Sequence, residues 1–377
     1  AQAAAPSPPP PPPIMPFNEA VQFAANNLFG KAELPASPSG KYQVVIDPLV
    51  DGNSGVQSNA TQTMEARVTD LLKTGYPKYE LLPFTPSSLV RGPLLFIGTF
   101  TAVDKDGRND GVREWYRVCL ALVDLRTGLI VSKGFARASL QDVDHTPTAF
   151  FLDSPAWAPD PATQGYVRTC QGTKVGDPIN PMYIDRVYAA AQIRDAVSAY
   201  TAGRYEEALD LYRAVLRSGA GDQLRVHNGM YLANKQLGRR NEAAVAFSRL
   251  VEYGFAQKRL GVKFLFRPAS SVFAGDTAAN AEYMMMLKQI STAAATGAKC
   301  VEVSGHTSRT GSEPINDRLS FSRADYVQKI LIRDAPKLRP KATAVGKGWK
   351  ENISGLGTDD NRDALDRRVE FKVEGSC

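Results

Sequence analysis

The feature that most constrains the fold is an internal repeat in the middle of the chain. The segments "GRYEEALDLY" (Gly203–Tyr212) and "GRRNEAAVAF" (Gly238–Phe247) match at a spacing of 35 residues, with Ala208 and Ala243 at corresponding points. Glycine ends a helix readily and alanine lets two helices cross closely, so the repeat predicts two helical hairpins. Two copies are fewer than the roughly three that a free-standing stack needs. We therefore expect these helices to pack on a neighbouring domain.

The two copies resemble a pair of tetratricopeptide repeats, whose period is about 34 residues. The resemblance implies a helical unit over residues 186–258. It also implies a groove that docks a peptide or another protein. A helical spacer between two domains would show the same pattern, and both interpretations remain open.

Composition excludes two classes of function. The 377 residues are enough for two or three domains. The formal net charge of +6 is spread along the chain, without the basic runs or aromatic ladders that bind nucleic acid. No stretch approaches the roughly 18 apolar residues that span a bilayer. We expect no nucleic-acid partner and no transmembrane segment.

The first 17 residues, "AQAAAPSPPPPPPIMPF", differ in composition from the rest of the chain. A start in small residues without an initiator Met is typical of a chain whose signal peptide has been removed, and trimming for expression would leave the same start. The proline tract predicts a semi-rigid polyproline II spacer. We expect residues 1–17 to be a tether that holds the protein at a surface. The tract contains no cysteine that a lipid could modify.

Residues 18–157 predict an α/β domain. Helical spacing appears in Phe17–Phe29 and in "NATQTMEARVTDLLKT", and the strands are "KYQVVID", "YELLPF", "GPLLFIGTFTAV", "EWYRVCLALVDL" and "GLIVSKGFARASL". This order indicates an α/β sandwich. It resembles the small domains of envelope lipoproteins, including CsgG-like, FlgO-like and TolB-N-like modules, which implies an adaptor that binds another protein. A purely structural domain is the alternative. Residues 158–185 are rich in Pro, Gly and Asp and read as a linker.

Residues 259–377 predict a compact α+β unit. "KFLFRPASSVF" is expected to be a strand that runs into a loop, followed by a helix in "NAEYMMMLKQISTAAAT" and a strand in "AKCVEVSGHT". A helix in "LSFSRADYVQKILI" and strands in "ATAVGKG" and "RRVEFKVE" complete the order βαβαββ. The whole chain is thus predicted to be a multidomain α+β protein.

This last unit resembles the OmpA-like C-terminal peptidoglycan-binding domain. The matching residues are Gly305–Thr307, Gly311, Asn316, Leu319–Ser320, Arg323–Ala324, Gly346–Gly348 and Asp366–Phe371. The last segment, "DRRVEF", begins with Asp366 where the family has Asn. The family holds the diaminopimelate-bearing stem peptide of the cell wall without covalent chemistry, so the resemblance implies wall binding here. The residues it implies for the site are Arg323, Ser308, Asn316, Thr307, Gly311, Leu319 and Arg367.

One departure from the family pattern bears on binding. The resemblance implies that Arg323, in the first turn of its helix, binds the ligand carboxylate with its planar fork of donors. The family places an Asp after Gly-His-Thr to bind the ammonium, whereas this chain has Ser308. Losing one charge-assisted hydrogen bond costs about 1.5–3 kcal/mol, and the adjacent Arg309 would add repulsion. Glu313 or Asp317 are the candidates for a replacement carboxylate.

The four cysteines are far apart and form no C-x-x-C pair, and the three histidines are dispersed. We therefore expect no metal site and no cofactor. The family's fold places the last strand antiparallel to the Gly-His-Thr strand, which implies that Cys300 bonds to Cys377 in an oxidising compartment. Cys119 and Cys170 are then left as the second pair.

These features predict a non-enzymatic periplasmic protein, associated with the outer membrane of a Gram-negative bacterium, that tethers an envelope structure to peptidoglycan. His306 and Ser308 lack a third group for catalysis. One alternative is a scaffold subunit of a secretion, pilus, flagellar or wall-synthesis complex in which wall binding has been lost. Another is a domain that binds a differently modified stem peptide.

Overall fold

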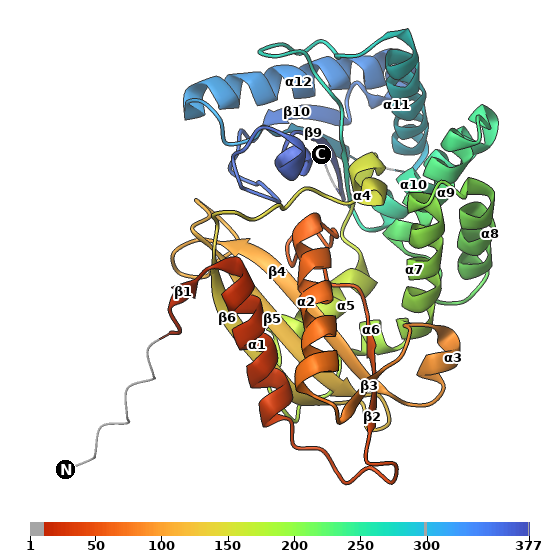
Figure 1. The fold of residues 1–377 in the computed structure, drawn as a ribbon. Coiled ribbons are helices and arrows are strands. Elements are labelled where there is room, and N and C mark those ends of the chain that lie inside the picture. Colours follow the sequence, from red (N-terminus) through yellow and green to blue (C-terminus); the bar gives the residue numbers. More distant parts are fainter. Residues whose placement is uncertain (1–10, 298–299, 376) are drawn as a thin grey trace.

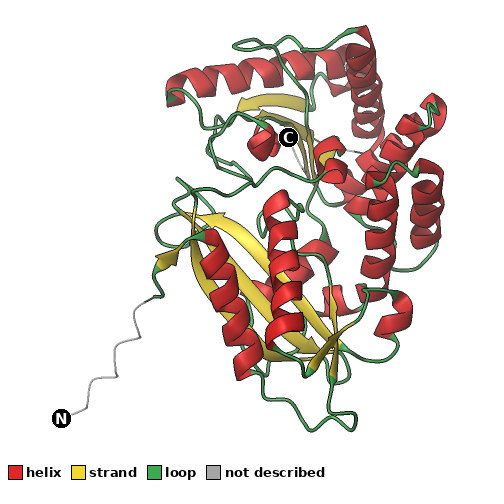
Figure 2. Ribbon diagram, viewed as in Figure 1, coloured by secondary structure: helices red, strands yellow, loops and turns green. Residues whose placement is uncertain are grey.

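The structure is a computed structural model that describes residues 11–297, 300–375 and 377. Two β-sheets lie one above the other, and a group of helices stands beside both (Figure 1). Figure 2 shows that helices cover the sheets and that long loops join the two halves. The proline tract falls mostly on residues 1–10, so its predicted conformation lies largely outside the described residues.

The first sheet has six strands in the order β1-β6-β5-β4-β2-β3. Strands β4, β5 and β6 form an antiparallel meander, while β2 is parallel to β4 and β3, and β1 is parallel to β6. The strands are β1 (Ile14–Met15), β2 (Tyr42–Ile46), β3 (Tyr79–Leu81), β4 (Leu94–Val103), β5 (Trp115–Asp124) and β6 (Leu129–Ser139). All residues of β4 are buried, because both faces of the sheet are covered.

Helices cover each face of this sheet. On one face lie α1 (Phe17–Lys31) and α2 (Asn59–Gly75), side by side in Figure 1, whose apolar residues share a core with the strands. The other face packs on α5 (Pro161–Gln171), α6 (Pro181–Ile184) and the start of α7 (Val187–Thr201). The short helices α3 (Pro86–Leu89) and α4 (Ala149–Asp153) lie in the connections.

Residues 158–185 are therefore not the linker that their composition suggested. Asp160 caps α5 by accepting a hydrogen bond from the Thr163 amide, and Pro161 occupies the first turn, where its missing N–H costs nothing. Tyr166 and Tyr183 are buried against the sheet. The Pro and Asp residues of this segment start helices instead of marking a domain boundary.

The repeat of the middle segment forms two helical hairpins. Helix α7 pairs with α8 (Tyr205–Leu216), and α9 (Leu224–Gln236) pairs with α10 (Arg240–Ala256). Gly203 and Gly238 stand between the helices of each hairpin at φ of +75° and +71°, which explains why both copies carry glycine. Tyr212 is buried at the helix crossing. The expected helices are present, and their membership of the tetratricopeptide family remains a prediction.

The second sheet has the order β10-β9-β11-β8-β7. Its elements are β7 (Ala156–Trp157), β8 (Arg259–Val262), α11 (Thr277–Gly297), β9 (Cys300–Gly305), α12 (Glu313–Asp334), η1 (Pro336–Leu338), β10 (Ala342–Gly346), η2 (Asn361–Asp366) and β11 (Val369–Glu374). From β8 onward this is the expected order βαβαββ. Strand β11 lies antiparallel to β9, as expected.

Two boundaries differ from expectation. The first strand of this unit is Arg259–Val262, just before the "KFLFRP" segment, which instead loops over the domain with a single bridge between Phe266 and Phe273. Residues Ala156–Trp157, assigned by sequence to the first domain, pair with β8 at the edge of the second sheet. The second sheet therefore begins at residue 156, well before the boundary at residue 259 that the sequence indicated.

One continuous apolar core runs from the helical hairpins into the second sheet, because buried residues of α8–α10 contact those of β8, α11 and α12. The hairpins thus pack on a neighbouring domain, as a two-copy repeat requires.

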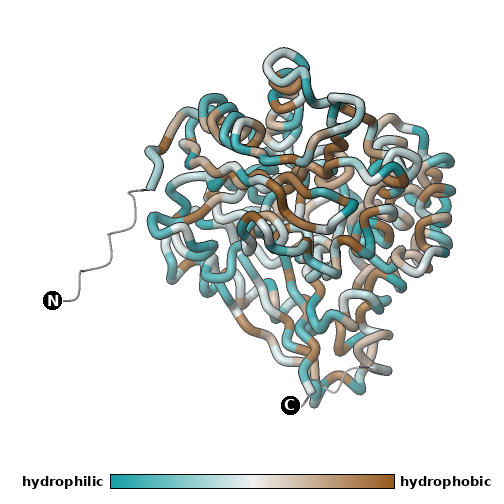
Figure 3. The backbone as a smooth tube through the Cα atoms, turned by 90° about the horizontal axis from the view of Figure 1, so that it is seen from below, coloured by the Kyte–Doolittle hydropathy of each residue, from teal (hydrophilic) through white to brown (hydrophobic). Residues whose placement is uncertain are grey.

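Figure 3 shows hydrophobic and hydrophilic stretches alternating along the tube. Among the described residues, no helix is both long enough and apolar enough to cross a membrane.

Candidate functional site

The site residues named from the sequence come together at the C-terminal end of β9. Thr307 and Ser308 lie two and three residues after the end of this strand, and the loop turns at Gly311, whose φ is +81°. Helix α12 then carries Asn316 and Arg323. Arg323 lies in the middle of α12, not in its first turn, because the helix starts at Glu313. Leu319 is half-buried, one turn before Arg323.

Several of the motif residues hold each other in place. The Thr307 amide donates to the Gly348 carbonyl at 2.9 Å, and the Gly348 amide donates to Oγ of Ser320 at 2.9 Å. Asn316 donates to the Thr310 carbonyl at 2.8 Å and so fixes the loop. A Cβ on Gly305 would lie 1.9 Å from the Ser320 carbonyl oxygen, so α12 can only lie this close to β9 at a glycine.

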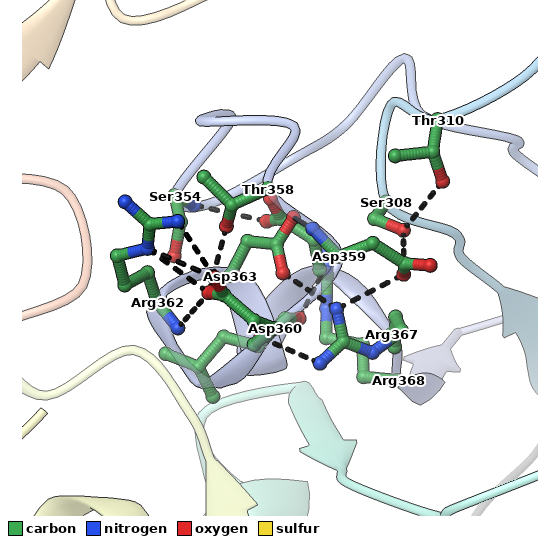
Figure 4. Close-up of polar contacts among 12 residues, drawn as sticks. Ser308, Thr310, Ser354, Thr358, Asp359, Asp360, Arg362, Asp363, Arg367 and Arg368 are labelled. Carbon is green, nitrogen blue, oxygen red and sulfur yellow. Dashed lines mark hydrogen bonds and ion pairs between the residues drawn. The ribbon is translucent and has the colours of Figure 1, made fainter. Parts of the chain in front are cut away.

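A carboxylate from another part of the chain lies beside Ser308. Oγ of Ser308 donates to Oδ1 of Asp359 at 2.6 Å and also lies 3.3 Å from Oγ1 of Thr310 (Figure 4). Ser308 is buried, whereas the Asp359 side chain is 53% exposed. The serine therefore supports a carboxylate that faces outward, and Oδ2 of Asp359 has no partner among the described residues.

The segment around η2 fixes Asp359. Its amide donates to Oδ2 of Asp363 at 2.9 Å, and its φ of +55° is one that Asp tolerates better than most residues. Arg367 bonds Asp363 at 2.5 Å, Asp359 at 3.3 Å and the Asp360 carbonyl at 2.7 Å. Both terminal nitrogens of Arg367 thus bond to groups of the protein. Arg367 positions the carboxylate, as Figure 4 shows.

The two carboxylates proposed from the sequence do not take this role. Glu313 and Asp317 both pair with Lys350, at 3.1 Å in each case, on the outer side of α12. Arg309 does not crowd the site either, because its guanidinium lies over the Trp349 ring, 5.6 Å from the centroid. Asp359 was missed because it lies 51 residues from Ser308 in sequence. The acidic pair in "TDD" before "RRVEF" was the available signal.

Arg323 is a buried cation. Its Nε donates to the Ser270 carbonyl at 3.1 Å, and the guanidinium lies 4.8 Å from the centre of the Phe266 ring. Only 8% of the residue is exposed. Burial lowers the pKa of Arg323 to about 10, and the negative charge of Asp359 partly opposes this shift. Arg323 therefore remains a cation at neutral pH.

His306 is buried within a network of charged side chains. Arg368 bonds Glu370 at 2.9 Å, and Arg259 bonds it at 2.6 Å. Neither ring nitrogen of His306 has a hydrogen-bond partner in the described part of the chain. Burial and the charge of Arg368 hold the pKa of His306 well below its usual range, so the ring is neutral. Ser308 bonds Asp359 and not this ring, so the two do not form a nucleophile–base pair.

A metal ion is disfavoured in the same network. Ligand atoms of His306, Glu351 and Glu370 lie within 4.8 Å of one another. However, Glu351 and Glu370 already have cationic partners: Lys372 bonds Glu351 at 3.1 Å, and the two arginines bond Glu370. An added cation would be repelled by these side chains.

The cysteines follow the expectation in part. Cys300 and Cys377 form a disulfide with a Cα–Cα distance of 5.3 Å, as the family's strand order implied. The expected bond between Cys119 and Cys170 is wrong for this structure, in which both are buried free thiols. The Cys119 thiol donates to the Cys170 carbonyl at 2.8 Å, within the apolar core between β5 and α5.

Comparison with known proteins places a known domain at this site. The OmpA family profile matches residues 272–365. Outer membrane porin F of Pseudomonas fluorescens is 42% identical over 79 residues, which are 20% of this chain and 23% of the porin. Outer membrane protein Omp38 of Acinetobacter baumannii is 32% identical over 74 residues, or 20% of each chain. The chain thus spans about a fifth of the length of these curated relatives.

Among solved structures, the peptidoglycan-associated lipoprotein from Burkholderia pseudomallei is 23% identical. The match covers 30% of this chain and 89% of the lipoprotein structure, with a TM-score of 0.26. The C-terminal part of the chain thus carries an OmpA family domain at residues 272–365.

Proposed function

We propose that this chain, whose residues 272–365 form an OmpA family domain, is a non-enzymatic envelope protein of a Gram-negative bacterium that binds peptidoglycan. The ligand is the diaminopimelate-type stem peptide, whose end carries an ammonium and a carboxylate on one carbon. Asp359 binds the ammonium and Arg323 binds the carboxylate. The first domain and the helical hairpins bind other envelope proteins, so the chain tethers an envelope structure to the wall in the periplasm.

The observation that carries this proposal is the hydrogen bond from Ser308 to Asp359. The proposal is supported by the outward-facing carboxylate that this bond holds beside Ser308, and by the effect of the Asp359 charge on the pKa of Arg323. A zwitterionic ligand needs one anion and one cation at close range, and a charge-assisted hydrogen bond to each supplies most of the specificity. The serine departure is therefore compatible with wall binding.

Co-sedimentation with purified sacculi tests the proposal. We expect the native chain to pellet with sacculi, and Arg323→Ala and Asp359→Asn each to weaken binding at least tenfold, since each removes one charge-assisted bond. Arg318→Ala is the matched control, because Arg318 lies on the same helix and is exposed. It should bind like the native chain. Arg323→Lys keeps the charge but loses the fork, and separates loss of binding from loss of folding.

Two results would overturn the proposal. If the native chain stays in the supernatant at every concentration, the domain does not bind the wall. If Arg323→Ala and Asp359→Asn pellet as the native chain does, the binding site lies elsewhere.

A second candidate function is a scaffold subunit of an envelope complex whose domain no longer binds diaminopimelate. The low exposure of Arg323 under Ser270 and Phe266 favours it, because a ligand carboxylate needs access to the guanidinium. A native chain that fails to bind sacculi, yet remains folded, would support this candidate.

A further inference from the structure

A cleft of about 400 Å³ adjoins Arg323 and is built by three parts of the chain. Its walls come from the C-terminal domain, from helix α9 of the helical hairpins, and from the end of α4 with the residues that follow it. The lining includes Asp153, Lys235, Lys263, Glu282, Arg323 and Arg367 among its charged residues. A volume of this size lies within the range of about 300–1,000 Å³ that is typical of ligand sites.

Arg323, which lines the cleft, has hydrogen-bond donors without a partner in the described residues. Its Nε is bonded to the Ser270 carbonyl, and the described residues provide no hydrogen-bond partner for its two terminal nitrogens. A guanidinium presents its terminal nitrogens as a planar pair that suits a carboxylate. This part of the cleft is therefore suited to an anionic group.

A second pair of charges lines the same cleft. Nζ of Lys235, on α9, lies 2.7 Å from Oε1 of Glu282, on α11. The hydroxyl of Tyr231 also donates to Glu282 and holds its carboxylate. The side chains of Lys235 and Glu282 are 46% and 24% exposed, so both charges can reach a ligand.

Part of the cleft wall is aromatic. Phe264 and Tyr283 pack edge to face with ring centroids 5.4 Å apart, and Phe266 lies under the Arg323 guanidinium. Lys263 is not a free cation here, because its Nζ donates to the carbonyls of Phe151 and Leu152 at 3.3 and 2.8 Å. Burial lowers the pKa of Lys263 to about 8. Lys235 is also paired, with Glu282, but its side chain is 46% exposed whereas Lys263 is buried, so Lys235 is the lysine of the cleft that a ligand can reach.

We propose that this cleft is a second subsite for the wall peptide bound at Arg323, with Lys235 binding another carboxylate of the same peptide. The inference rests on the proposed function and adds a partner for the ligand from outside the OmpA family domain. A stem peptide carries several carboxylates, and the aromatic wall covers its aliphatic part. The helical hairpins therefore take part in wall binding directly and are more than a spacer.

Titration calorimetry on the full chain separates the two parts of the cleft. One probe is meso-diaminopimelate alone, which is short and engages Arg323 and Asp359. The other is the soluble tripeptide L-alanyl-γ-D-glutamyl-meso-diaminopimelate. It adds the free α-carboxylate of the D-glutamyl residue, which is the group that we expect to bind Lys235. We expect Lys235→Ala to weaken the tripeptide about tenfold, the worth of one charge-assisted bond, and to leave diaminopimelate unchanged.

Lys288→Ala is the matched control, because Lys288 is an exposed lysine of α11 that does not line the cleft. It should bind both probes as the native chain does. The exposed Lys235–Glu282 pair contributes little to stability, so Lys235→Ala remains folded. If Lys235→Ala binds the tripeptide like the native chain while Arg323→Ala does not, the second subsite is refuted and the proposed function stands. If the native chain binds neither probe, both fail together.

Discussion

Ser308 and Asp359 are joined by a hydrogen bond of 2.6 Å between residues that lie 51 positions apart in the chain. Ser308 donates from a buried position, and the carboxylate of Asp359 faces outward. A carboxylate therefore lies directly beside the hydroxyl that follows Gly305–Thr307. This hydrogen bond fixes the position of both side chains.

This relationship predicts that a carboxylate at position 308 can replace the carboxylate of Asp359. Asp359→Asn should weaken sacculus binding at least tenfold, because it removes the anion while Asn tolerates the left-handed φ of +55°. The double variant Ser308→Asp with Asp359→Asn restores one carboxylate at the site and should recover most of the binding. Co-sedimentation across a series of protein concentrations measures both.

Ser308→Asp alone is the informative control for this pair. It places two carboxylates within hydrogen-bond distance, where like charges disfavour each other. We expect it to lower the melting temperature and to give no gain in binding. Tighter binding by Ser308→Asp would mean that Asp359 does not act as the site's carboxylate.

The buried carboxylate of Glu370 should be important for stability. Glu370 is fully buried between Arg259 and Arg368, so Glu370→Ala leaves an unpaired buried cation. We expect the free energy of unfolding to fall by about 3–5 kcal/mol, measured by urea denaturation. Glu207→Ala, which breaks an exposed pair with Arg204, should cost less than about 1 kcal/mol. Equal effects would contradict the assignment.

The same group predicts a dependence on acid. Burial alone would raise the pKa of Glu370, but Arg368 and Arg259 outweigh it and hold the pKa at about 2. Because the folded-state pKa is depressed, its contribution is fully present above the unfolded value near 4.5. It is lost as pH falls towards 2. The difference in unfolding free energy between native chain and Glu370→Gln should therefore shrink between pH 5 and pH 2.

Glu65 should act in the opposite sense. Burial raises its pKa to about 7, so the folded state keeps a proton that the unfolded chain releases near 4.5. The stabilisation is present at low pH and lost as pH rises to about 7. Glu65→Gln keeps an acceptor for the Leu49 amide, which lies 2.8 Å from Oε1. Its melting temperature relative to the native chain should rise from pH 5 to pH 8, and a constant difference would refute the shift.

Thiol chemistry distinguishes the two cysteine pairs. We expect two thiols to react after denaturation without reductant, those of Cys119 and Cys170, and neither to react readily in the native state, because both are buried. Replacing Cys300 and Cys377 with Ser should lower the unfolding free energy by about 2–4 kcal/mol. Finding no reactive thiol after denaturation would show that Cys119 and Cys170 are bonded in solution.

Most elements could be predicted from the sequence, because local periodicity follows from which faces are buried. The strands of the meander and the helices α1, α2 and α11 lie where alternation or helical spacing indicated. The repeat glycines marked the turns of both hairpins, since only a positive φ fits there. The C-terminal strand order, and with it the Cys300–Cys377 bond, was implied by the resemblance to a known family.

The segment 158–185 shows where composition alone misleads. Its Pro and Asp residues suit a linker and also suit helix starts, and the choice depends on whether an apolar face finds a partner. Here Tyr166 and Tyr183 pack on the first sheet, which only the tertiary structure decides.

The sequence by itself determined the helices and strands with a clear local period, the turns of the two hairpins and the likeness of the last unit to the OmpA family, because these depend on local pattern and short motifs. The tertiary structure alone decided that Asp359, and not Glu313 or Asp317, lies beside Ser308, and that Lys235 shares a cleft with Arg323. The physical reason is distance along the chain. A hydrogen bond or a shared cleft depends on how separate elements pack, and no local pattern records that packing.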